Sequence, residues 1–142
     1  MSQTNPPQCR LPDWQARLVT YLHAARMRLF AYGQHDCSLF AADCVSAMTG
    51  QDMAALWRGR YTTLRGGIRV LRRAGFVDHI ALTASLFPEI PPLSAQPGDL
   101  AVVPTAEAPA LGVVQGEAVY LLGPTGLGLA SLLVAQRAFR VI

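Results

Sequence analysis

Cys37 is the residue in this sequence whose type and setting are best suited to chemistry. It directly follows Asp36, a good N-cap residue because its carboxylate accepts a hydrogen bond from a free helix amide. Cys37 would then be the first residue of a helix, where exposed amides and the helix dipole stabilise a thiolate. This setting predicts a lowered thiol pKa and a nucleophilic cysteine. The alternative is a small buried hydrophobic residue, a common fate of free cysteines.

The helix that would carry Cys37 is predicted to run to about Thr49, with Gly50 following its C-terminus. Gly33, before the helix, permits the turn that leads into it. Apolar residues cover nearly all of the predicted helix surface, which is typical of a central helix. Cys44 lies two turns after Cys37 on the same face, and we expect it to be a core residue.

The other elements predict an α+β domain in which helices precede an antiparallel sheet. One helix is predicted to begin after Asp13 and to bear an apolar stripe as far as Leu29. Shorter helices are predicted over 53–57, 64–73 and 80–87, and strands over 100–103, 111–115, 118–122, 127–133 and 138–142. We expect one domain over 1–142, with a helical part at about 12–90, a proline-rich connection at 87–99 and a β part at about 100–142.

Composition favours a folded protein, because 51% of the residues are hydrophobic and only 15% are charged. So low a charge suggests that a partner covers some apolar surface. No run is long and apolar enough to span a bilayer. Residues 1–7 lack the features of a signal peptide. We therefore expect a product that is made in the cytoplasm without a signal peptide, or carried out of the cell within a particle.

The net charge of +3 comes from arginine alone, and half of the arginines fall between residues 58 and 73. This cluster would suit nucleic acid, but a solvated helix face or a protein interface explains it more simply. The three cysteines, Cys9, Cys37 and Cys44, do not form a disulfide framework. No metal-binding spacing such as CxxC or HxxxH occurs. The sequence therefore predicts neither a metal nor a cofactor.

The segment around Cys37 resembles a known motif. The pattern Gly-x-x-Asp-Cys-Ser-x-Phe at residues 33–40 resembles the nucleophile motif of the NlpC/P60 peptidases, and its compact form is similar to small relatives encoded in phage and prophage tail gene clusters. The run Pro-Gly-Asp-Leu at residues 97–100 and the run Arg-Gly-Arg-Tyr at residues 58–61 add to this resemblance. It implies a papain-like fold, cleavage of cell-wall peptides, and Cys37 at the nucleophile position.

One position departs from that family. The strand that follows Pro-Gly-Asp-Leu there supplies the catalytic histidine, whereas here the matching position holds Ala110. A cysteine peptidase needs a base that takes the thiol proton and later protonates the leaving amine, and an alanine cannot do this. The following segment, 118–133, contains no His, Asn or Gln that could orient a histidine.

Two other histidines could replace the missing base. His35 lies two residues before Cys37 and is the better candidate, although it could instead be a turn residue that bonds to backbone or to a partner. His79 follows Asp78, which could orient its ring, or the pair could be only a surface turn. His23 lies beside the apolar stripe of the first helix, and we expect it to be a boundary residue.

The resemblance therefore implies a phage or prophage tail-tip or tail-assembly component on an NlpC/P60-like scaffold, a degenerate peptidase with a structural role in the virion tail. Its expected partners are other tail and hub proteins. The alternative is an active cysteine peptidase that cleaves peptidoglycan stem peptides during genome delivery, with Cys37 as nucleophile. A weaker hypothesis is an arginine-mediated contact with nucleic acid.

Overall fold

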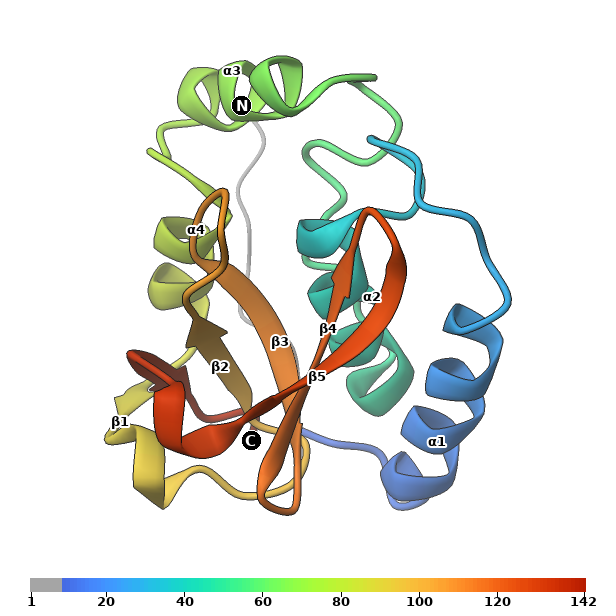
Figure 1. Ribbon diagram of the computed structural model, residues 1–142, viewed down its shortest axis with the longest axis vertical. Coiled ribbons are helices and arrows are strands. Elements are labelled where there is room, and N and C mark those ends of the chain that lie inside the picture. Colours follow the sequence, from blue (N-terminus) through green and yellow to red (C-terminus); the bar gives the residue numbers. More distant parts are fainter. Residues whose placement is uncertain (1–8) are drawn as a thin grey trace.

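The computed structural model describes residues 9–142 and has an α+β architecture, as predicted (Figure 1). The helices of this part of the chain come first: α1 (Trp14–Ala25), α2 (Cys37–Thr49), α3 (Leu64–Arg73) and α4 (His79–Leu86). The strands follow: β1 (Glu89–Ile90), β2 (Leu100–Val103), β3 (Ala110–Gln115), β4 (Ala118–Gly123), β5 (Gly126–Ser131) and β6 (Arg137–Phe139). The expectation about a signal peptide concerns residues 1–7, which lie outside the described residues.

The strands form a six-stranded sheet in the order β1-β6-β2-β3-β4-β5, and every neighbouring pair is antiparallel. The strands β3 and β4 are joined by a two-residue hairpin turn at Gly116-Glu117, which the sequence predicted, and Gly116 there has φ 65°. The last strand, β6, returns across the sheet to lie between β1 and β2. This return brings the C-terminal residues beside the start of β2.

The central helix α2 has the predicted bounds because its two ends are capped by local chemistry. The Asp36 carboxylate accepts a hydrogen bond from the Leu39 amide at 2.9 Å, and Gly50 takes the left-handed conformation with φ 83°. The helix packs against α1, β3 and β4, which explains why its surface is apolar nearly all round. The nucleophile candidate therefore lies at the end of a rigid, buried element.

Several local predictions were wrong. The strand predicted over 127–133 ends at Ser131, where a short 3₁₀ helix over Leu132–Val134 follows it, and the strand predicted over 138–142 ends at Phe139. The helix α1 ends at Ala25, so Leu29 lies beyond the apolar stripe and is 89% exposed. Residues 53–57 form turns, because Met53 and Trp57 are buried by tertiary contacts that need no helix. A two-residue strand, β1, lies within the proline-rich connection, where it pairs with β6. Over residues 9–142, no helix combines the length and apolar character needed to cross a membrane.

Candidate functional site

The turn before Cys37 is built around the Asp36 carboxylate, which is 1% exposed. One oxygen accepts from the Leu39 amide and the Ser38 hydroxyl, at 2.9 and 3.0 Å. The other accepts from the Gly33 amide at 2.9 Å and from the Tyr61 hydroxyl at 2.5 Å. Four donors thus surround one buried carboxylate, and together they fix the backbone that presents Cys37.

The run Arg58-Gly59-Arg60-Tyr61 lies directly against this turn. Gly33 has φ 82°, and a Cβ placed on it would stand 2.0 Å from the Tyr61 carbonyl oxygen. In return, the Gly59 amide donates to the Gly33 carbonyl at 2.9 Å. The close approach of these two segments requires glycine at position 33. This contact joins residues far apart in the chain, so no local pattern of the sequence predicts it.

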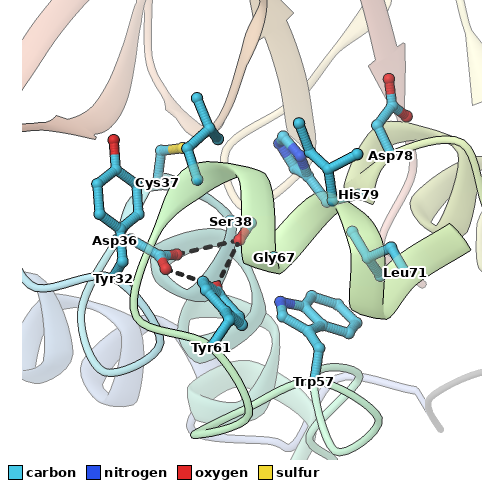
Figure 2. Close-up of a pocket in the computed structure, with 12 residues that line it drawn as sticks. Tyr32, Asp36, Cys37, Ser38, Trp57, Tyr61, Gly67, Leu71, Asp78 and His79 are labelled. Atoms are coloured by element: carbon cyan, nitrogen blue, oxygen red, sulfur yellow. Dashed lines mark hydrogen bonds between the residues drawn. The ribbon is translucent and has the colours of Figure 1, made fainter. Parts of the chain in front are cut away.

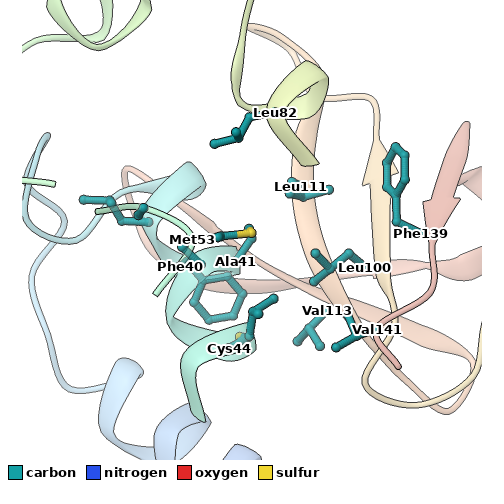
Figure 3. Close-up of a cluster of buried hydrophobic side chains, with 14 of the residues drawn as sticks. Phe40, Ala41, Cys44, Met53, Leu82, Leu100, Leu111, Val113, Phe139 and Val141 are labelled. Atoms are coloured by element: carbon teal, nitrogen blue, oxygen red, sulfur yellow. The ribbon is translucent and has the colours of Figure 1, made fainter. Parts of the chain in front are cut away.

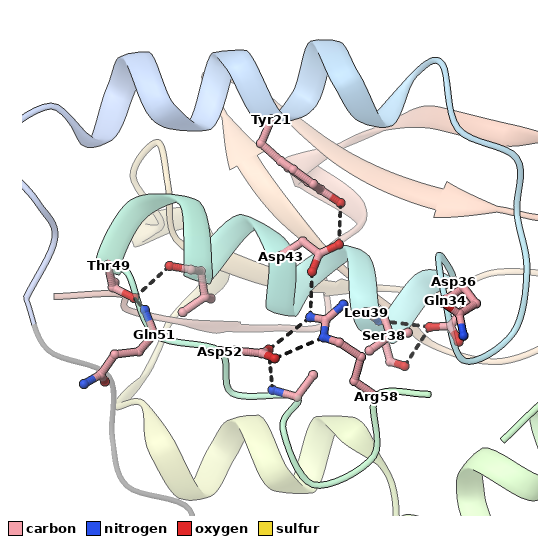
Figure 4. Close-up of polar contacts among 12 residues, drawn as sticks. Tyr21, Gln34, Asp36, Ser38, Leu39, Asp43, Thr49, Gln51, Asp52 and Arg58 are labelled. Carbon is pink, nitrogen blue, oxygen red and sulfur yellow. Dashed lines mark hydrogen bonds and ion pairs between the residues drawn. The ribbon is translucent and has the colours of Figure 1, made fainter. Parts of the chain in front are cut away.

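A second polar cluster lies on the outward side of α2 (Figure 4). Asp43 accepts a hydrogen bond from the Tyr21 hydroxyl at 2.9 Å and forms an ion pair with Arg58 at 2.6 Å. The same guanidinium contacts Asp52 at 3.0 Å. Arg58 therefore ties α2 to the segment that ends in Tyr61, so the two clusters hold this segment at its first and last residues.

Two cavities share lining residues at Cys37, and Figure 2 shows the residues of the inner one. The inner cavity, of about 50 Å³, extends from Cys37 towards Trp57 and Tyr61. The outer cavity, of about 250 Å³, lies between Cys37 and the strands β3 and β4 with the loop that precedes β3. Four residues line both cavities: Tyr32, Cys37, Leu64 and His79. Cys37 and His79 thus lie at the junction of the two.

The prediction of a lowered thiol pKa for Cys37 was wrong. Burial raises this pKa to about 11, and the charge of Asp36 adds to the increase. Amides of Cys37 and Ser38 at the helix N-terminus favour the thiolate, but they offset only part of the increase. Near neutral pH, Cys37 is therefore a protonated thiol and needs a base to become a nucleophile.

His79 is the histidine that shares both cavities with Cys37. It is the first residue of α4 rather than part of a polar surface turn, because the Asp78 side chain caps the helix by accepting from the Ala81 amide at 2.8 Å. Its Nε2 atom is buried and has no hydrogen-bond partner among the described residues. Burial lowers the pKa of His79, which keeps its ring neutral near pH 7. A neutral imidazole with a free nitrogen is able to accept a proton.

His35 is buried and lines neither of the two cavities beside Cys37. Its backbone pairs with Ala31, which fixes the turn. Burial is the main cause that lowers the pKa of His35, and the charge of Arg28 adds to it. The third histidine, His23, is exposed on α1.

Ala110 is the first residue of β3 and lines the outer cavity together with Cys37. The strand therefore brings this position to the cavity beside the cysteine, but supplies only a methyl group. Two residues further along β3, position 112 requires glycine, since a Cβ there would lie 2.2 Å from the Tyr120 carbonyl oxygen on β4.

The other two cysteines lie elsewhere. Cys44 is fully buried between α2 and the sheet, in the layer that Figure 3 shows, as predicted for a core residue. Burial raises its pKa well above the usual value. Cys9 is exposed, and all three cysteines are free. Among residues 9–142, no three His, Cys, Asp or Glu side chains come together in a way that could hold a metal ion.

The molecule is thus an α+β domain with a half-buried thiol at a helix N-terminus, facing a mainly apolar cavity. Residues 9–141 match a family described as a domain of unknown function, DUF6950, and the chain belongs to that family. A comparison with curated proteins finds no match.

Proposed function

We propose that this protein is a tail-tip or tail-assembly component of a phage or prophage, built on an NlpC/P60-like scaffold that has lost its peptidase chemistry. The observation that carries the proposal is Ala110. It lines the cavity beside Cys37 at the position where the resembled family has its catalytic histidine. A thiol with a pKa of about 11 and no base on β3 is poorly suited to catalysis at neutral pH.

The proposed place of action is the virion tail, and the proposed partners are other tail and hub proteins. Several apolar side chains are exposed, among them Leu93, Leu129 and Leu133 at 72%, 64% and 80% exposure. Their exposure supports the proposal that partner proteins cover part of this surface. Under this proposal, the protein is made in the host and leaves the cell as part of the particle.

The test of this role uses purified particles. Mass spectrometry of tails should detect the chain at a fixed ratio to other tail proteins. Deletion of its gene should stop tail assembly or infection, and a Cys37→Ala gene should restore both as well as the wild-type gene does. Tails that lack the chain would contradict the proposal, as would a Cys37→Ala gene that restores assembly without infectivity, which would instead indicate an essential thiol.

The second candidate is an active cysteine peptidase acting on peptidoglycan stem peptides, and one observation favours it. His79 lines both cavities at Cys37 and has an unpartnered nitrogen. In this mechanism, Nε2 of His79 accepts the thiol proton while Sγ attacks the peptide carbonyl, and the imidazolium then protonates the leaving amine. General acid–base catalysis by this histidine would raise the reaction rate about 10²–10⁴-fold. The cavities therefore favour His79 over His35 in that role.

Purified protein and muropeptides distinguish the two candidates. The peptidase predicts cleavage between pH 5 and 9 that is abolished in Cys37→Ala and reduced at least 100-fold in His79→Gln. Cleavage should persist in Cys44→Ala and His35→Gln, which are the matched controls. If folded wild-type protein cleaves nothing over this pH range, the peptidase is excluded, and the tail role then depends on the particle experiment.

A further inference from the structure

One side of α3 carries four exposed arginines, which we call the arginine face: Arg65, Arg69, Arg72 and Arg73. Within residues 9–142, none of their guanidinium groups forms an ion pair or a hydrogen bond. At 3.6 residues per turn, the four side chains fall within an arc of about 100° that contains no other residue of the helix. Figure 1 shows α3 at the upper edge of the molecule, so the arginine face is accessible to a partner.

This arrangement opposes the stability of the helix that bears it. Spacings of three and four residues place like charges side by side, and Arg65 lies in the first turn, where the helix dipole disfavours a cation. No acidic residue occurs in that turn or anywhere in residues 53–77. A merely solvated surface usually mixes both signs of charge. The structure thus leaves four positive charges that only an anion from outside the chain can neutralise.

The arginine face fits phosphate better than an acidic protein. A guanidinium group binds a phosphate through two parallel hydrogen bonds, and the chain has no lysine. The centre of a protein interface is apolar, whereas the arc of the arginine face has no aliphatic or aromatic side chain. Interfaces with nucleic acid are more polar and much more positively charged.

Two other polyanions fit the surroundings of α3 less well. The apolar side of the helix lines the inner cavity through Gly67, Ile68 and Leu71, so it is not free to insert into an anionic membrane. The helix has no aromatic residue on which the bases of a single strand could stack. These observations favour a duplex.

The kind of duplex follows from the donors on the arginine face. Proteins that bind duplex RNA contact its 2′-hydroxyl groups, and guanidinium groups have no acceptor for those hydroxyl hydrogens. Contacts with phosphate alone fix position without reading sequence. The arginine face therefore suits the backbone of DNA of any sequence.

We propose that the arginine face of α3 binds the phosphate backbone of duplex DNA without sequence preference. This surface goes beyond the proposed tail role and does not rest on it. Its test uses the purified chain and a DNA duplex, so its failure is distinct from failure of the proposed function.

The experiment measures fluorescence anisotropy of a labelled duplex of about 20 base pairs during titration with the full chain. Four phosphate contacts predict a slope of about −3.6 for the logarithm of the association constant against the logarithm of salt concentration. The affinity should therefore fall about 100-fold between about 50 and about 200 mM salt. Two duplexes of unrelated sequence should bind within about threefold of each other.

Two double variants separate the arginine face from net charge. Arg69→Gln with Arg73→Gln removes two of the four contacts and should reduce the slope to about −1.8. Arg26→Gln with Arg140→Gln is the matched control, since it removes the same charge from two exposed arginines outside α3 that also form no ion pair. This control should keep the wild-type slope.

The proposal is overturned if the wild-type chain does not bind the duplex at the lowest salt concentration, or if both double variants reduce the slope equally. Two competitors test the other polyanions. If polyglutamate displaces the duplex at equal charge concentration, the face serves an acidic protein instead. If vesicles rich in phosphatidylglycerol bind the chain more tightly than the duplex does, it serves a membrane surface, and DNA is the wrong partner.

Discussion

At the scale of single residues, the behaviour of Cys37 follows from two opposing influences. The start of α2 offers amides that favour a thiolate, but burial and the Asp36 charge favour the thiol. Desolvation is the larger influence because the sulfur lies beside apolar walls rather than at an open helix end. A sequence displays the helix start and its cap, whereas burial of the sulfur depends on α3 and β3, which are remote in the chain.

Alkylation of Cys37 by iodoacetamide should therefore depend steeply on pH. With a thiol pKa of about 11, the thiolate fraction at pH 8 is about 10⁻³, and it rises about tenfold for each pH unit up to pH 10. A Cys9→Ser variant removes the exposed cysteine, and fully buried Cys44 should stay unmodified in folded protein. Mass spectrometry of the modified peptide gives the rate. A rate that levels off below pH 8 would contradict the raised pKa.

Removal of the Asp36 carboxylate should be strongly destabilising. Asp36→Ala leaves four donors without their acceptor, of which the Gly33 and Leu39 amides and the Tyr61 hydroxyl make buried bonds. We expect a loss of about 3–5 kcal/mol in the free energy of unfolding, measured by urea denaturation. Asp13→Ala is the matched control, because Asp13 precedes α1 in the same way but its side chain makes no capping bond. The Asp13→Ala variant should lose under about 1 kcal/mol of unfolding free energy. Equal losses in the two variants would mean that the four hydrogen bonds to Asp36 do not stabilise the fold.

At the scale of elements, the sequence predicted what local chemistry determines. The bounds of α2 and α3 match the prediction, because capping side chains define where each helix starts: Asp36 for α2 and Thr63 for α3. Most of the sheet was predicted as well, since turns at Gly116 and near Gly126 separate short apolar strands. The candidate site was only half predicted. Cys37 was found from its motif, but His79 was named only as the second candidate after His35. Tertiary packing decides which histidine lies beside Cys37, and it also brings Trp57 there, which no local pattern encodes.

Two facing glycines test how closely the segment ending in Tyr61 packs on the cysteine turn. Gly33 and Gly59 both have positive φ, 82° and 75°, but a Cβ on Gly33 would overlap the Tyr61 carbonyl while one on Gly59 would meet nothing within 4 Å. Gly59→Ala should cost about 1–2 kcal/mol of unfolding free energy from backbone strain alone. Gly33→Ala should cost about 3 kcal/mol or more, since the segment must also move. Equal costs would mean that the two segments separate easily.

At the scale of the whole molecule, the two ends of the described chain are joined through one buried carboxylate. Asp99, from the Pro-Gly-Asp turn, is 1% exposed and accepts from the Arg10 guanidinium, the Gln96 amide and the Val141 amide. Arg10 also donates to the Val141 carbonyl at 2.8 Å. The Pro-Gly-Asp run thus has a structural explanation within this chain, independent of any resemblance. It fixes the start of β2 and closes the fold at the end remote from Cys37.

Arg10→Ala should therefore lower the free energy of unfolding by about 2–3 kcal/mol, because it leaves the Asp99 carboxylate buried with one partner fewer. Arg137→Ala is the matched control. Arg137 also forms an ion pair, with Glu89 at 2.8 Å, and both arginines lie over an aromatic ring. The Arg137 pair is exposed, however, and should contribute at most about 1 kcal/mol. Urea denaturation measures both losses, and amide hydrogen exchange at Val141 should accelerate only in Arg10→Ala. If the two variants lose stability equally, burial of the Arg10–Asp99 pair does not close the fold, and the apolar core alone must hold the two ends together.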